Sequence, residues 1–238
     1  MLQSESEPRL YRLFRLLCGL FTHLLCAAFT GFVAILTKPG SSLFSWHPFL
    51  MTLAVPRSQA LTRRISLDTC EFSFFMTEAI LLFSPHSSPV AKLKHQVKSR
   101  LHWILQCSCV SCALAGLGTI FYNKHLNSKP HFSTWHGLMG VVTVCVVVLQ
   151  SAGALPLIYH KLVKGWSLAK LKRYHAAAGL VTYLLGSVSL LLGTCSTWFT
   201  ASVGENAWYV TMLCPTLSAL TIMSQVTNAY MAKKRLQS

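Results

Sequence analysis

The chain has 238 residues, of which 53% are hydrophobic and only 11% are charged. Soluble domains carry about 25% charged residues, so this composition excludes an ordinary soluble protein and indicates an all-α membrane protein. The formal net charge of +15 does not point to nucleic acid as a partner, because the basic residues lie at the ends of apolar runs rather than along one polar face.

Five apolar runs are long enough to cross a bilayer, which requires roughly 20 residues per helix. They cover about residues 16–36, 101–122, 135–158, 174–196 and 207–229. A sixth run, Leu43 to Phe83, is apolar at both ends but contains Pro56, three arginines and Asp68 in between. The apolar pattern alone therefore leaves open five spans or six.

The distribution of lysine and arginine favours six spans. Most of these residues lie in the N-terminal flank, in the connections before residues 101 and 174, and in the C-terminal tail, whereas the intervening connections hold only Lys38, Lys124 and Lys129. The two sets alternate sides only if the interrupted run counts as one span. We therefore expect a single domain, residues 1–238, with six transmembrane helices, the second formed by residues 43–54 plus 72–84. Both termini are expected in the cytoplasm.

Four of the ten histidines stand at the start of different apolar segments, each beside an aromatic residue. They are His47 in "SWHP", His102 in "RLHW", His136 in "TWHG" and His175 in "RYHA". Ionisable side chains at membrane depth are costly, so they are functional candidates by default. One such histidine is more often a hydrogen-bonded structural residue, but one in each of four consecutive helices favours a shared role. The lone His23 in the first span needs no function.

Successive helices run antiparallel, so His47 and His136 are expected near one membrane face and His102 and His175 near the other. Two imidazoles that face each other across a bundle interior can hold a haem iron from opposite sides. Zinc is less favoured, because it takes three or four protein ligands and only two are evident at each face. The nine cysteines are expected to be buried thiols, since all but Cys70 fall in apolar segments.

In these motifs the chain resembles the cytochrome b561 family of transmembrane, ascorbate-dependent oxidoreductases. The similar segments are "KPGSSLFSWHP", "FMTEAILLFSP", "LAKLKRYHAAAGLVTYLLGSVSLLLG" and "NAYMAKKR". The resemblance implies a central four-helix bundle with two haem b groups, one on His47 and His136 at the non-cytoplasmic side and one on His102 and His175 at the cytoplasmic side. It further implies that cytoplasmic ascorbate reduces monodehydroascorbate or ferric chelates across the membrane. The membrane implied is that of the endoplasmic reticulum or of cytoplasmic vesicles.

The histidine spacing offers an explanation for the interrupted run. In residue number, His102 and His136 differ by 34 and His136 and His175 by 39, but His47 and His102 differ by 55. Without Val55–Glu71 that last interval becomes 38, and the two apolar halves join into a run long enough to span. We interpret Val55–Glu71 as an insertion; the alternative is a polar loop between two half-helices. Because proline breaks helices and a mid-bilayer arginine costs about 2.5–3.5 kcal/mol, we expect impaired haem assembly at His47.

Ascorbate is an anion at neutral pH, so its site is expected to be basic. The candidates precede the cytoplasmic-side histidines and are Lys98, Arg100, Lys170, Lys172 and Arg173. Contact with lipid headgroups is the alternative role for each of them. At the opposite mouth, Lys124, His125 and His131 are weaker candidates for meeting the acceptor. Glu78, in the second half of the interrupted helix, is expected to pair with an interior group or to stay protonated, without a catalytic role.

Two other functions stay open at this stage. One is a haem-free multipass transporter or scaffold, in which the histidines are structural or form a proton path. The other is a non-functional insertion form of the reductase that still enters the membrane. The haem absorbance spectrum discriminates among the three. The sequence decides neither the physiological acceptor nor whether the chain forms a homodimer.

Overall fold

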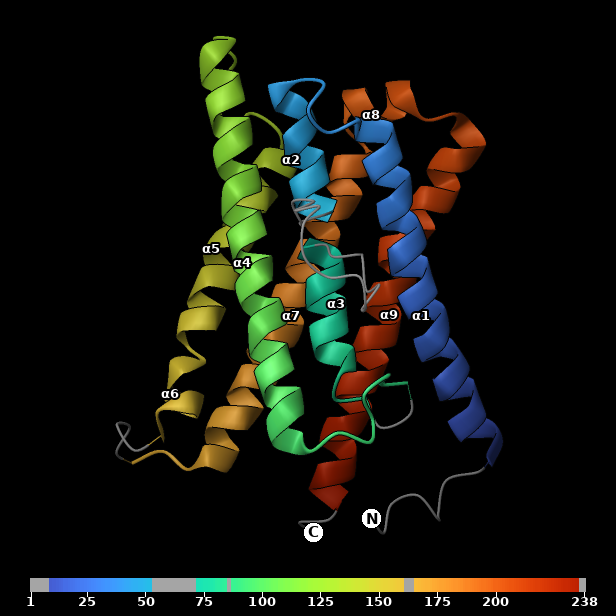
Figure 1. The fold of residues 1–238 in the computed structure, drawn as a ribbon, viewed down its shortest axis with the longest axis vertical. Helices are drawn as coiled ribbons and strands as arrows, with labels where there is room; N and C mark the ends of the chain where they lie inside the picture. The colour runs from blue at the N-terminus through green and yellow to red at the C-terminus, as the bar shows by residue number, and fades with distance from the viewer. Residues whose placement is uncertain (1–8, 53–71, 85–86, 161–164, 236–238) are drawn as a thin grey trace, which may run out of the picture.

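The computed structural model of the chain describes residues 9–52, 72–84, 87–160 and 165–235. In these ranges every regular element is a helix, as the sequence predicts. Five stretches among the described residues are long and apolar enough to cross a membrane. They are α1 (Arg9–Thr37), α4 (His95–Leu126), α5 (Trp135–Ala152) together with α6 (Leu155–Ile158), α7 (Leu168–Thr194) and α9 (Glu205–Arg235). These five coincide with the five uninterrupted apolar runs (Figure 1).

Several helices begin before their apolar runs because polar residues continue the same backbone geometry at the ends. α4 begins at His95 and α7 at Leu168, in both cases ahead of the predicted run. Ser167 caps α7, with its hydroxyl accepting a hydrogen bond from the Lys170 backbone N–H. The sequence did not predict the short helix α8 (Thr197–Ser202), which Ser196 caps in the same manner.

The interrupted run forms two ten-residue helices, α2 (Leu43–Thr52) and α3 (Phe72–Leu81). Both pack against α4, α2 towards its C-terminal half and α3 towards its N-terminal half (Figure 1). Each rises only about 15 Å, so neither crosses a bilayer by itself. The segment that we interpret as an insertion, Val55–Glu71, lies outside the described residues.

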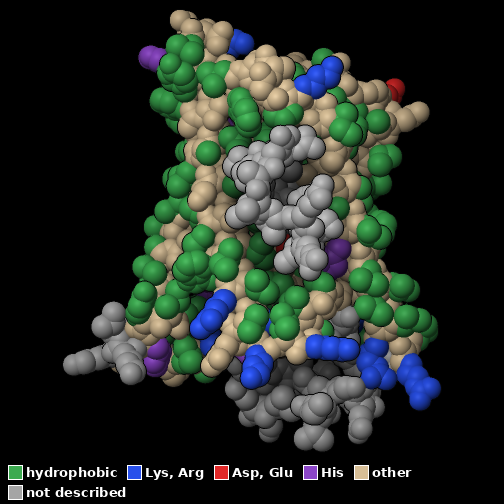
Figure 2. Space-filling model, viewed as in Figure 1, with side chains coloured by type: hydrophobic (Ala, Val, Ile, Leu, Met, Phe, Trp, Pro, Cys, Tyr) green, Lys and Arg blue, Asp and Glu red, His purple; other side chains and the backbone are tan. Residues whose placement is uncertain are grey.

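The helices close into a ring. α1 packs on α2 and α3, these on α4, α4 on α5, α5 on α7, α7 on α9, and α9 on α1 (Figure 1). α1 begins and α9 ends at the same end of the bundle, where α4 and α7 also begin and α3 ends. We call this the terminal end and the opposite one the distal end. Lysine and arginine side chains gather at the terminal end on the face shown in Figure 2.

The core fills the middle of the ring. It is formed by Phe75, Met76 and Leu81 of α3, Cys109, Cys112 and Ala113 of α4, Val144 and Val147 of α5, Tyr183 of α7 and Ile222 of α9. By contrast, only 17–33% of the residues in the most apolar stretch of each long helix are buried within the chain. The remaining apolar surface faces outward, where a bilayer is the solvent that it matches. The same outward faces carry Cys107, Cys145 and Cys195, so the prediction that the cysteines are buried is wrong for these three.

Candidate functional site

The four predicted histidines form two facing pairs. At the distal end, the ring centres of His47 on α2 and His136 on α5 are 6.1 Å apart, with the ring planes at 68°. At the terminal end, the ring centres of His102 on α4 and His175 on α7 are also 6.1 Å apart, at 79°. All four side chains are partly buried. The structure therefore brings together the pairs that the antiparallel order of the helices predicts.

Three of these imidazoles point Nδ1 at a backbone carbonyl oxygen. The pairs are His47 with Gly116, His102 with Ala79, and His136 with Ser189, each at 2.9 Å. A carbonyl oxygen only accepts hydrogen bonds, so Nδ1 must carry the proton in each neutral ring. Nε2 then keeps its lone pair and can serve as a ligand atom. Such a partner on the far nitrogen is what orients a metal-ligating histidine.

The fourth histidine has a side-chain partner instead. The amide nitrogen Nε2 of Gln150, on α5, lies 3.1 Å from His175 Nδ1 and 2.8 Å from the His175 carbonyl oxygen. In the structure this amide donates to both atoms, so Nδ1 accepts and the hydrogen of the neutral His175 ring lies on Nε2, unlike in the other three histidines. Ligation of a metal through Nε2 would move that hydrogen to Nδ1 and require the amide to turn its oxygen towards it, with loss of the bond to the His175 carbonyl. The orientation of His175 therefore depends on a single replaceable side chain. Neither Gln150 nor the three carbonyl groups was identified from the sequence.

A repeated interval connects the two pairs. Each of α4, α5 and α7 carries a histidine of one pair and, 14 residues later, a residue that is hydrogen-bonded to a histidine of the other pair. These residues are His102 and Gly116 on α4, His136 and Gln150 on α5, and His175 and Ser189 on α7. An α-helical segment of this length rises about 21 Å. The two histidine pairs are therefore separated by about 21 Å along the bundle, with the apolar core between them.

Two glycines of α7 leave room for these side chains. A Cβ atom at Gly193 would lie 3.1 Å from His136 Cε1, and one at Gly179 would lie 3.2 Å from Gln150 Nε2. Both contacts are too tight for an added side chain without movement of the ring or the amide. The close approach of α7 to α5 thus depends on glycine both beside His136 and beside Gln150.

The predicted basic residues lie at the terminal end, around the first turns of α4 and α7. Lys98 is half-buried, whereas Arg100, Lys170, Lys172 and Arg173 are exposed. At the distal end, Lys124 donates a hydrogen bond to the Pro130 carbonyl at 3.1 Å and the His131 ring stacks on Phe121 at 4.1 Å. These two weaker candidates for meeting the acceptor are thus engaged within the chain, while His125 is exposed.

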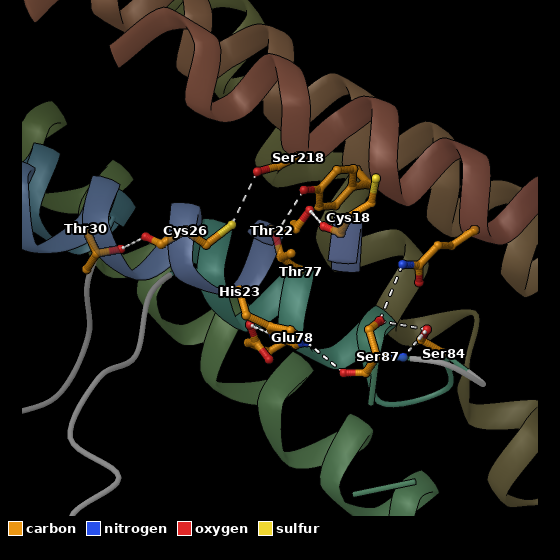
Figure 3. Close-up of polar contacts among 12 residues, drawn as sticks. Cys18, Thr22, His23, Cys26, Thr30, Thr77, Glu78, Ser84, Ser87 and Ser218 are labelled. Carbon is orange, nitrogen blue, oxygen red and sulfur yellow. Dashed lines mark hydrogen bonds and ion pairs between the residues drawn. The ribbon is translucent and has the colours of Figure 1, made fainter. Parts of the chain in front are cut away.

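Glu78 pairs with His23, as Figure 3 shows. His23 Nδ1, on α1, lies 2.6 Å from Glu78 Oε1, on α3, and His23 Nε2 lies 3.1 Å from the Ser87 carbonyl oxygen. The expectation that Glu78 pairs with an interior group is confirmed, but its partner is the histidine for which the sequence indicated no role. Among the described residues this is the one contact between a carboxylate and a basic side chain.

Comparison with known proteins identifies the family. Residues 66–200 match the family model of eukaryotic cytochrome b561, and the chain belongs to this family. The match includes His102, His136 and His175, whereas His47 precedes it.

The similarity to individual members extends over nearly the whole chain. The chain is 50% identical to the human transmembrane reductase CYB561D2 and 48% identical to the bovine one, over 236 residues that cover 99% of each protein. It is 37% identical to the human probable transmembrane reductase CYB561D1, over 98% of this chain and 94% of that protein. The chain is accordingly a multi-pass membrane oxidoreductase of a family that binds haem b and transfers electrons across membranes.

The separation of the rings in each histidine pair fits two ligands of one haem iron. Two metal–nitrogen bonds of about 2.0–2.1 Å, plus about 1.1 Å from each nitrogen to its ring centre, give about 6.3 Å between ring centres. The observed separation is 6.1 Å in both pairs. Within the described part of the chain, no three or more His, Cys, Asp or Glu side chains come together, so a zinc site with the usual ligand number is not formed there.

Proposed function

We propose that this chain transfers single electrons across a membrane, from ascorbate on the cytoplasmic side to monodehydroascorbate or a ferric chelate on the other side. One haem b would be held by His47 and His136 and a second by His102 and His175. The observation that carries the proposal is the presence, in a member of the cytochrome b561 family, of two histidine pairs with the same 6.1 Å separation at opposite ends of one bundle.

The chain's own residues define the chemistry that these sites permit. Each haem, when bound, supplies a one-electron iron couple. Two histidines would ligate each haem iron and would leave no coordination place for oxygen or substrate, which favours electron transfer. The backbone carbonyls of Gly116, Ala79 and Ser189 hold three of the imidazoles in the tautomer that offers Nε2. The apolar core between the pairs keeps water out of the middle of the bundle.

The orientation proposed for the chain follows the positive-inside rule. Basic residues concentrate at the terminal end, so that end is assigned to the cytoplasm, together with both termini. In this assignment α2 and α3 jointly make the sixth span, and residues 1–238 form a single domain. An endoplasmic reticulum or vesicle membrane is proposed from the family resemblance.

The ascorbate site is proposed at the terminal end beside His102 and His175. Lys98 is about one helical turn from His102 on α4, and Lys172 and Arg173 lie within one turn of His175 on α7. Anionic substrates are attracted by such a cluster of fixed positive charge, and the attraction weakens as ionic strength rises. Arg100 and Lys170 complete the cluster.

Reconstitution tests the proposed function directly. The purified chain is inserted into liposomes that contain a ferric chelate, ascorbate is added outside, and internal ferrous iron is measured together with the haem absorbance spectrum. We expect b-type bands that ascorbate reduces, and internal iron reduction that liposomes without protein do not show. A purified, folded chain without haem bands contradicts the proposal and supports the haem-free transporter or scaffold.

A further inference from the structure

We propose that His23 and Glu78 form a proton-binding site that is linked to the redox centre at His102 and His175. The site takes up one proton when that centre gains an electron and releases it when the electron leaves. This inference rests on the proposed function, because it requires a redox centre between those two histidines. It assigns a role to a pair of residues, drawn in Figure 3, that is not part of the two histidine pairs.

The hydrogen bonds around His23 show that the pair holds a proton. The Ser87 carbonyl oxygen, 3.1 Å from Nε2, only accepts, so Nε2 carries a hydrogen. Nδ1 and Glu78 Oε1 would then both be acceptors if the carboxylate were ionised and the ring neutral, and two acceptors do not approach to 2.6 Å. One further proton must lie between them. The described arrangement is therefore the proton-loaded state, with no net charge on the pair.

Loss of this proton changes the contacts of His23. The neutral ring has one hydrogen, which either stays on Nε2 and leaves the short Nδ1–Oε1 contact unsupported, or moves to Nδ1 and leaves the Ser87 carbonyl without a donor. The pair then carries one negative charge. Release of the proton thus has both an electrostatic and a hydrogen-bonding consequence, which makes the pair responsive to charge nearby.

The backbone places this charge next to the terminal-end histidines. Glu78 directly precedes Ala79, whose carbonyl oxygen accepts the hydrogen bond from His102 Nδ1 at 2.9 Å. On its other side Glu78 follows Thr77, which is hydrogen-bonded at 2.9 Å to Tyr183 of α7, the helix that carries His175. Charges interact strongly where water is excluded, so an electron added at these histidines favours the proton-loaded pair. By thermodynamic linkage, a proton bound at the His23–Glu78 pair also favours an electron at these histidines.

Among the residues that the structure describes, few other charges lie around the pair to obscure this coupling. The chain has six acidic residues, and Glu78 is the one acidic residue that lies inside a helix among the described residues, since Glu205 stands in the first turn of α9. Among the described residues, the titratable side chains of the network and core next to the pair are Cys18 and Cys26 on α1, with Arg15 further towards the terminal end, Cys109, Cys112 and His102 on α4, and Tyr183 on α7. From α9, Ser218 and Gln225 contact the same network and do not titrate.

Ascorbate monoanion, the donor of the proposed function, loses one electron and one proton on the terminal side. The redox centre that His102 and His175 would hold would accept the electron as a one-electron iron couple, and the His23–Glu78 pair would take one proton from water on that side. When the electron is passed on, the pair would return its proton to the same side. No proton crosses the membrane in this step.

The test measures the reduction potentials of the purified, haem-loaded chain as a function of pH. In the natural chain we expect the potential of one centre to fall as pH rises, approaching the limit of about 59 mV per unit for one proton per electron. Glu78→Gln keeps a hydrogen-bond acceptor for His23 but cannot become a carboxylate. Its potential should match that of the natural chain at low pH and exceed it at high pH, because the negative charge that stabilises iron(III) is missing.

Two further variants separate proton binding from the attachment of α1 to α3. Thr77→Val, on the same helix, removes the contact with Tyr183 and leaves the pair intact, so the natural pH dependence should remain. Glu78→Leu removes both the proton site and the contact, so it should flatten the pH dependence and lower the melting temperature. If Glu78→Gln does not retain haem, His23→Gln provides a second test, because the Glu78 carboxyl group then titrates without its imidazole partner and the pH range in which the potential changes should shift.

The outcomes are distinguishable. Absence of haem from the natural chain overturns the proposed function and this inference with it. Two haem centres whose potentials do not vary with pH overturn only this inference. An unchanged pH dependence in Glu78→Gln also overturns it, since the proton then binds elsewhere. A pH dependence lost in Thr77→Val as well as in Glu78→Gln shows a structural effect of α3 and equally contradicts the proton site.

Discussion

The two histidine pairs are alike in geometry and unlike in support. Their ring centres are separated by the same 6.1 Å, yet the terminal-end pair stands on the unbroken helices α4 and α7, of 32 and 27 residues. In the distal-end pair, His47 stands on α2, which has only ten residues. Short helices are marginal without tertiary contacts. The comparison teaches that ligand geometry alone does not determine how firmly each site retains its cofactor.

The largest expected effect comes from removing one ligand at the terminal end. His102→Ala leaves His175 without a facing imidazole, so we expect complete loss of one b-type centre and of ascorbate-driven reduction. Haem per chain and the low-temperature absorbance spectrum measure this loss. His125→Ala, an exposed histidine on the same helix, serves as the control and should retain all haem. Normal haem loading in His102→Ala would show that this pair does not bind haem.

The second effect concerns the distal-end pair and the segment proposed as an insertion. Deleting Val55–Glu71 should join α2 to α3 in one continuous span and strengthen the site at His47. We expect haem content to rise from about one to about two per chain, or the weaker centre to survive longer on warming in detergent. Equal haem content and equal retention with and without this segment would contradict the insertion hypothesis.

A measurement on the terminal-end centre completes this test. His102 and His175 are held by Ala79 of α3 and Gln150 of α5, so the spectrum and the melting behaviour of that centre should be unchanged. If both centres gain equally, the deletion acts on the stability of the whole bundle rather than on the site at His47.

Much of this arrangement could be predicted from the sequence, for identifiable reasons. The five long spans follow from uninterrupted apolar runs, and the pairing of the histidines follows from their position at the starts of antiparallel helices. These features are local or topological, so the linear sequence contains them. The helix ends and the short helix α8 were missed, because caps such as Ser196 and polar first turns extend helices beyond hydropathy.

The hydrogen-bond partners of the histidines were not predictable in the same way. Ala79, Gly116 and Ser189 contribute backbone carbonyls, which any residue type has, so no side-chain signal marks them. One signal was present, namely the interval from His136 to Gln150, but its meaning depends on the packing of helices that are far apart in sequence.

The interval of 14 residues between a histidine and a hydrogen-bond partner of the other pair is also informative for the interrupted helix. The residue numbers of His47 on α2 and Ala79 on α3 differ by 32, and without Val55–Glu71 this difference becomes 15, close to the 14 of the other three helices. The hydrogen-bond pattern thus gives the insertion hypothesis a support that is independent of the intervals between histidines.

A smaller effect is expected from Gln150, the side chain that distinguishes the support of His175 from that of the other three histidines. Gln150→Leu removes the partner of Nδ1, makes the imidazole a weaker electron donor and raises the potential of the terminal-end centre. A hydrogen bond worth about 1 kcal/mol corresponds to about 40 mV for one electron. Gln150→Glu should shift the same potential downward. Spectroelectrochemical titration should show that the reduction potential of the distal-end centre is unchanged. An equal shift in the potentials of both centres would indicate a general change in packing.

The smallest effect is expected from the exposed cations that surround the terminal-end pair. Replacing Lys172 and Arg173 by glutamine removes two positive charges that the solvent already screens, so we expect the KM for ascorbate to rise a few-fold with kcat nearly unchanged. The increase should shrink as salt is added, because screening removes the same attraction in the natural chain. Lys129→Gln, an exposed lysine at the distal end, is the matched control and should leave the KM for ascorbate unaltered. If Lys129→Gln raises that KM and the double variant does not, ascorbate enters from the distal end, and the assignment of the two pairs to the two membrane faces must be reversed.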